Sequence, residues 1–175
     1  MVVVAALLMM AAAGQTIGRE ALVGWGVSAG WWDCGDLGGT PAAVVSYHWP
    51  QWLVQIGYGE PDGVVAGSVV NGEVWAIEGF RLWRSAGAEV KRSWFAGAGA
   101  GYYDVGIDGR SAGGGWHDTD TAFGGAIIVG LGWPSGWTAQ VEYVVAGGID
   151  VRPSGSSAPK RIDIDGLRVH VGKRF

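Results

Sequence analysis

The chain has 175 residues, which is enough for one domain. Its net charge of −4 and pI of about 5.2 give no support to a nucleic-acid partner. Cys34 is the only cysteine, so an intrachain disulfide and a cysteine-based metal site are excluded, and we expect no metal or cofactor. The 33 glycines would suit a disordered chain, but a hydrophobic fraction of 49% argues against one.

The N-terminus begins with the apolar segment MVVVAALLMMAAAG, residues 1–14. This segment is shorter than the about 20 apolar residues that a bilayer-spanning helix needs. Ala11 and Ala13 form the A-x-A pattern of a signal cleavage site, although the usual basic start is missing. We therefore expect a signal peptide over residues 1–14 and one domain over residues 15–175. A buried N-terminal strand or helix is the alternative.

After this segment, large apolar residues alternate with small or polar ones, and a period of two predicts β-strands. The pattern predicts eight strands, over residues 21–32, 42–49, 52–59, 73–84, 94–107, 123–133, 137–145 and 162–175. Three short turns alternate with four longer loops, at residues 33–40, 60–72, 108–121 and 150–161. In the fourth strand either Glu78 or Arg81 must point outward, unless a bulge changes the register.

The face opposite the large apolar residues is mostly glycine, with a few polar groups. Ile127, Val129 and Leu131 share one face of their strand, for example, and Gly124 and Gly130 share the other. This pattern suits a narrow polar interior and a lipid-facing exterior. The predicted fold is all-β: an eight-stranded antiparallel up-and-down transmembrane β-barrel. Short periplasmic turns and four longer extracellular loops would place it in the outer membrane of a Gram-negative bacterium.

The aromatic residues form two groups when the strands are threaded up and down. The group at the turn end comprises Trp49, Trp52, Trp83, Trp94, Trp133, Trp137 and Phe175. The group at the loop end comprises Trp31, Trp32, Tyr58, Trp75, Tyr102, Tyr103 and Phe123. Two such girdles are expected where aromatic rings lie at the two membrane interfaces. The long loops are acidic, and acidic loops could bind divalent cations shared with lipopolysaccharide phosphates. We favour the interpretation that these charges are solvated and keep the loops soluble.

The C-terminal segment IDIDGLRVHVGKRF ends in an apolar alternation and a terminal Phe175. Together with WFAGAGAGYYDVGIDG, DTAFGGAIIVGLGW and WTAQVEYVV, it resembles the small outer-membrane β-barrel superfamily of OmpA-like, OmpW-like and opacity-type proteins. The resemblance implies that Phe175 is the signal read by the barrel-assembly machinery. Lys173 departs from the family pattern, in which this position is often aromatic.

The inward faces carry the polar residues of the predicted interior. They are Ser46, His48, Gln55, Thr138, Gln140, Glu142, Arg168, His170 and Arg174, with Glu78 or Arg81. Eight strands enclose a space that side chains fill, so buried charges must pair. We expect Gln55, Gln140, Glu142, Arg168 and His170 to form a polar network that plugs the barrel.

These features predict a non-enzymatic outer-membrane barrel with a structural or surface-interaction role, in contact with outer-membrane lipid and lipopolysaccharide. We expect a monomer, because a closed barrel leaves no edge strand. One alternative is OmpW-like passage or binding of a small hydrophobic compound. Another is a lipid A deacylase or acyltransferase, for which Ser46 and His48 are weak catalytic candidates. A soluble lipocalin-like barrel would need the large apolar faces to point inward.

Overall fold

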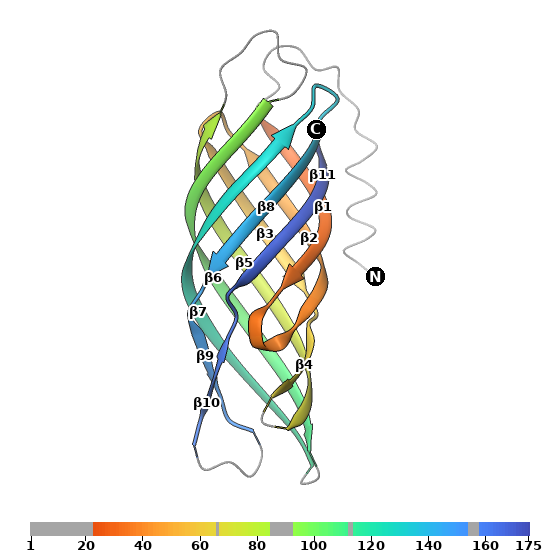
Figure 1. Cartoon of the computed structure of the whole chain (residues 1–175), viewed down its shortest axis with the longest axis vertical. Helices are drawn as coiled ribbons and strands as arrows, with labels where there is room; N and C mark the ends of the chain where they lie inside the picture. The colour runs from red at the N-terminus through yellow and green to blue at the C-terminus, as the bar shows by residue number, and fades with distance from the viewer. Residues whose placement is uncertain (1–22, 66, 85–92, 112–113, 154–157) are drawn as a thin grey trace.

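The computed structural model describes residues 23–65, 67–84, 93–111, 114–153 and 158–175, and these form a closed antiparallel barrel (Figure 1). Eight strands make its wall: β1 (Gly24–Asp33), β2 (Gly39–His48), β3 (Trp52–Gly59), β5 (Ser68–Arg84), β6 (Ser93–Ser111), β7 (Gly114–Gly132), β8 (Trp137–Val145) and β11 (Gly166–Arg174). Each pairs with the next in this order, and β11 returns to β1. The predicted eight-stranded up-and-down barrel is confirmed. No described helix is long or apolar enough to cross a membrane.

The two ends of the barrel differ. At the turn end, short connections join β2 to β3 and β7 to β8, and the C-terminus lies there too (Figure 1). At the loop end the connections carry structure of their own: η1 (Gly35–Leu37), β4 (Asp62–Val65), β9 (Gly148–Val151) and β10 (Lys160–Asp163). The predicted signal peptide and the predicted short turn between β5 and β6 lie outside the described residues.

Three of the four predicted longer loops contain paired strands. β6 and β7 remain paired through residues 108–121, out to the partners Ser111 and Gly114. β4 pairs with β5 within residues 60–72, and β9 pairs with β10 within the last predicted loop. These segments contain many Gly and Asp residues, which suggested loops; an alternation of apolar and polar residues is present around β9 and β10 but not in residues 108–121, where the strands continue the pairing of the barrel wall.

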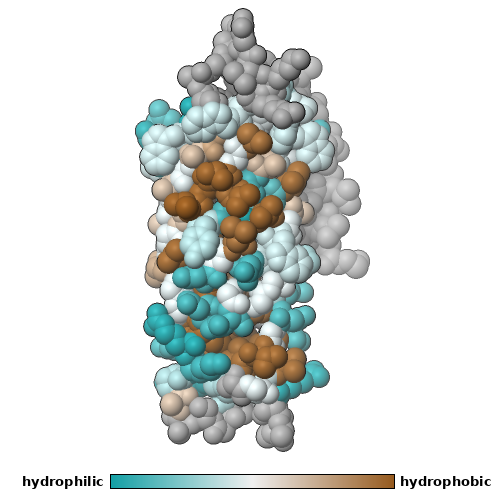
Figure 2. All heavy atoms as spheres, in the orientation of Figure 1, coloured by the Kyte–Doolittle hydropathy of each residue, from teal (hydrophilic) through white to brown (hydrophobic). Residues whose placement is uncertain are grey.

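The polarity of the residues that face outward and inward changes part-way along β6. In β6 the outward residues change from alanine and Tyr102 to Asp104 and Asp108, while the inward residues change from glycine to Val105 and Ile107. We call the turn-end part the barrel body and the loop-end part the cap. The cap core is at most 1% exposed and contains Leu37, Val65, Val70, Val74, Val105, Ile107, Ile149, Val151, Ile162 and Ile164. Figure 2 shows brown apolar side chains gathered over the body and a teal polar zone below them.

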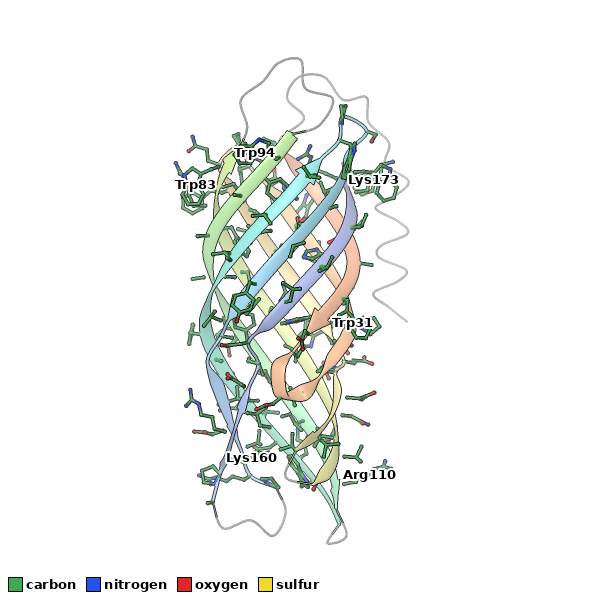
Figure 3. All side chains as sticks on the ribbon, in the orientation of Figure 1. Trp31, Trp83, Trp94, Arg110, Lys160 and Lys173 are labelled. Atoms are coloured by element: carbon green, nitrogen blue, oxygen red, sulfur yellow. The ribbon has the colours of Figure 1, made fainter. Side chains whose placement is uncertain are left out.

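Aromatic side chains lie on the exterior of the body. Figure 3 shows Trp83 and Trp94 at the turn end, with Trp31 further along the barrel. Trp25, Tyr47 and Trp49 stack in sequence, with ring centroids 5.0 and 4.4 Å apart. The assignment of Trp32 and Tyr103 to the outer girdle is wrong, because both are buried inside the barrel. Each lies an even number of residues after an inward-facing glycine of its own strand, so its side chain also faces inward.

Candidate functional site: the polar cluster inside the barrel

An ion triad occupies the interior of the body. The Arg168 Nη1 atom donates to Glu78 Oε2 at 2.6 Å and lies 3.4 Å from Glu142 Oε2. All three side chains are fully buried. The guanidinium of Arg168 also lies over the indole ring of Trp32, 3.8 Å from its centroid. The Arg168 guanidinium therefore contacts two carboxylates and one aromatic face, in a space where charges must be paired.

Neutral donors complete the bonding of the two carboxylates. Gln55 Nε2 donates to Glu78 Oε2 at 2.7 Å and to Glu142 Oε2 at 2.8 Å. The Tyr103 hydroxyl donates to Glu78 Oε1 at 2.7 Å. The side chains come from β3, β5, β6, β8 and β11, so the bonds connect strands around the whole barrel. Among the described residues, Arg168 Nε and Nη2 have no hydrogen-bond partner, so the cluster is only partly satisfied.

A second group of polar residues continues the cluster towards the turn end. Gln140 Nε2 lies 3.2 Å from His170 Nε2 and 3.5 Å from Gln55 Oε1. His170 Nδ1 lies 2.9 Å from Ser28 Oγ, and its Nε2 lies 3.8 Å from Glu142 Oε2. The structure thus brings together the predicted residues Gln55, Gln140, Glu142, Arg168 and His170.

The facing of β5 is now defined. Glu78 points inward, Arg81 points outward, and the pairing with β6 is continuous without a bulge. The Arg81 guanidinium lies 5.2 Å from the ring centroid of Trp52, near the turn end, where a long cationic side chain extends towards water. Sequence reasoning missed Tyr103, Trp32 and Ser28 as members of the cluster. The strand parity of Tyr103 and Trp32 was the signal that would have found them.

Apolar residues close the cluster on both sides. Leu53 and Phe80 lie on the turn-end side of Gln55 and Glu78 in their own strands, and both are fully buried. On the loop-end side, Val74 and Val144 lead into the cap core. The expectation of a mostly glycine and polar interior is therefore too simple, because the polar cluster lies between two apolar layers. The three charged side chains of the triad are fully buried between these residues.

The pair proposed as a weak catalytic candidate lies apart from the triad. Ser46 Oγ and His48 Nε2 are 3.1 Å apart, and both side chains are buried near the turn end of β2. His48 Nδ1 has no hydrogen-bond partner among the described residues. A Ser–His–acid triad needs a carboxylate at that nitrogen to orient the ring. The described residues therefore supply two members of such a triad and not the third.

Several cap carboxylates bind backbone amides. Asp120 and Asp118 accept from the amides of Asp150 and Arg152 at 2.8 and 2.7 Å, which ties the β9–β10 hairpin to β7. Asp36 accepts from the Asp163 amide at 3.0 Å, and Asp165 accepts from the Ala146 amide at 2.8 Å. No described group of three or more His, Cys, Asp or Glu side chains is arranged to hold a metal ion. These carboxylates have a structural role in the cap.

Several solved structures resemble this one, while no family model and no curated protein sequence matches the chain. Neisserial surface protein A aligns with a TM-score of 0.55 and 11% identity, over 90% of this chain and 98% of its own. The N-terminal β-barrel domain of Pseudomonas aeruginosa OprF aligns with a TM-score of 0.52 and 13% identity, over 86% of this chain and 96% of its own. This is the fold of the small eight-stranded outer-membrane barrels.

In this outer-membrane barrel fold, the residue predicted to be the assembly signal ends the closing strand. The Phe175 amide donates to the Trp25 carbonyl at 2.7 Å, and Lys173 Nζ lies 5.9 Å from the Phe175 ring centroid. The other predicted interface residues, Trp31, Trp49, Trp52, Trp83, Trp94 and Trp137, are exposed on the exterior, and Trp133 is partly exposed. A large apolar exterior with aromatic ends is what a lipid environment requires.

Proposed function

We propose that this protein spans the bacterial outer membrane as a plugged, non-enzymatic barrel that holds its cap at the cell surface. The observation that carries the proposal is the change from apolar to polar outward residues along β6 and β7. In the body the outward residues of β6 and β7 are mostly apolar, whereas in the cap they are polar or glycine, and the inward cap residues of β5 and β6 are apolar; Val64 and Val69 are the exposed apolar exceptions in the cap. A body that faces lipid and a cap that faces water explain both halves. Lipopolysaccharide and the barrel-assembly machinery are the partners expected on this proposal.

The polar cluster serves this function by closing the barrel. The triad of Glu78, Glu142 and Arg168 is fully buried, and Leu53 and Phe80 fill the interior beneath it. An eight-stranded barrel is just wide enough to be filled by side chains. The interior therefore acts as a plug, and the surface role belongs to the cap, since binding residues concentrate on segments held by a rigid scaffold.

The test compares the purified chain refolded with and without detergent or phospholipid, run boiled and unboiled on a cold SDS gel. We expect β-type circular dichroism and a heat-modifiable band only when detergent or lipid is present. In planar bilayers we expect no steady conductance. A monodisperse β-rich protein that folds without detergent would contradict the membrane assignment, and a stable open channel would contradict the plug.

No second function is proposed. All eight strand interfaces are paired, so the described wall shows no lateral opening of the kind that passage of a hydrophobic compound would use. Ser46 and His48 face the interior near the turn end, away from the exterior surface that meets lipid. Lipid A acylation that changes in a Ser46→Ala variant would revive the enzymatic hypothesis.

A further inference from the structure

A groove of about 480 Å³ crosses the exterior of the body over β6, β7, β8 and β11. Ala96 and Ala139 contribute the small outward side chains of its floor. In the strand register Ala139 lies between Leu131 and Val171, and both of these larger residues are exposed at its sides. The groove is therefore a hollow where small residues interrupt a surface of large ones. This face is turned towards the viewer in Figures 1 and 2.

Aromatic and cationic groups lie at the turn-end rim of the groove. Trp94 lines it from β6. Lys173 and Trp137 are direct partners in the register, one row closer to the turn end than Val171 and Ala139. Figure 3 shows Trp94 and Lys173 at the same end of the barrel. Lys173 is exposed and forms no ion pair with any described residue. The apolar hollow thus lies one register row from an ammonium group that has no carboxylate partner among the described residues and lies 5.9 Å from the centroid of the Phe175 ring.

We propose that this groove binds one acyl chain of an anionic phospholipid, whose phosphate lies against the Lys173 ammonium. The inference rests on the proposed function, because it requires the exterior of the body to face lipid. Lipid chains are as apolar as the groove, so hydrophobicity alone does not favour this position over the bulk bilayer. Selectivity comes from packing of the chain against the groove walls and from the ammonium–phosphate attraction.

A single hydrocarbon chain suits this hollow better than a second copy of the protein. The hollow at Ala139 is one residue wide, whereas a stable protein interface buries about 800 Å² on each partner. A symmetric dimer centred on the groove would also bring the two copies of Lys173 close together without a counter-charge. Charge and width therefore both favour a lipid.

Native mass spectrometry of the full chain in detergent tests the proposal, with dioleoyl phosphatidylglycerol and the net-neutral dioleoyl phosphatidylcholine as probes. Ala139→Phe fills the hollow, and we expect at least about fivefold weaker binding of both lipids. Lys173→Gln should weaken phosphatidylglycerol about fivefold and phosphatidylcholine less, because the choline cation partly offsets the charge of its phosphate. Ala100→Phe, outward on β6 but outside the groove, and Lys160→Gln, at the opposite end in Figure 3, are matched controls with no expected effect.

The heat-modifiable band of each variant first establishes that it folds, and Ala139→Leu replaces Ala139→Phe if the larger residue prevents folding. If the wild-type barrel forms but the groove variants bind both lipids like the wild type, the groove inference is overturned and the proposed function stands. If Ala139→Phe instead abolishes a dimer, the groove is a protein interface. If no barrel forms in detergent, both proposals fail.

Discussion

Removal of the central cation gives the sharpest test of the interior. Arg168→Met keeps a long apolar stem but leaves Glu78 and Glu142 buried without a cation, and it removes the contact with the Trp32 ring. Breaking a buried ion pair by deleting one partner costs about 3–5 kcal/mol. We expect the free energy of unfolding to fall by this amount. Adding Glu78→Gln and Glu142→Gln to the variant should restore at least about 2 kcal/mol, because the two orphaned charges are then absent.

The assay is reversible urea unfolding in phospholipid vesicles, followed by tryptophan fluorescence and by the heat-modifiable band. Arg110→Met, in the exposed cap, is the matched control and should change the free energy by less than about 0.5 kcal/mol. If Arg168→Met is as stable as the wild type, the triad does not contribute as argued. If it is destabilised but the added glutamine substitutions restore nothing, the loss comes from packing rather than from charge.

Three further results are expected. Burial raises the pKa of the Cys34 thiol to about 12, so the thiol is protonated at pH 8. We therefore expect it to react with a maleimide only after unfolding. Rapid labelling of the folded chain would contradict its burial. Ile127→Arg places a charge on the apolar exterior and should cost about 2–4 kcal/mol of folding free energy in vesicles. Thr119→Arg, on the same face of β7 but in the cap, should cost little. Equal costs would refute the boundary between body and cap. Asp120→Ala removes the acceptor of the Asp150 amide and should speed proteolysis of the β9–β10 hairpin. Asp120→Asn keeps an acceptor oxygen and should not. Similar proteolysis rates for the two variants would show that the cap does not depend on this bond.

The strands of the body could be predicted because their alternation depends on one fact, that each residue faces either lipid or a narrow interior. β3 and β8 begin and end at the predicted residues, since apolar alternation and a turn at Pro50 or Pro134 bound them directly. The pairing of Glu142 with Arg168 was also accessible, because both residues have inward parity and unpaired charge cannot remain there.

The cap could not be predicted with the same rule. The predicted strand 94–107 includes Val105 and Ile107, but a rule that places large apolar residues outside does not explain why these two residues face inward. Trp32 and Tyr103 were misplaced for a related reason, since aromatic residues near a strand end suggest an interface position. Their partners, the Arg168 guanidinium and the Glu78 carboxylate, become visible only when β11 and β5 are placed around the same interior.

The pairing of β6 with β7 is unbroken from the body to Ser111 and Gly114, which makes the described tip of this hairpin, placed at the cell surface by the proposed function, a stiff extension of the wall. Such a tip keeps its shape when nothing is bound, so a partner or an antibody meets a preformed surface and orders little of it on binding. Recognition of this kind depends on conformation rather than on linear sequence. An antibody raised against the folded protein should therefore lose its epitope when the barrel is boiled in SDS, in the same step that shifts the band on the gel.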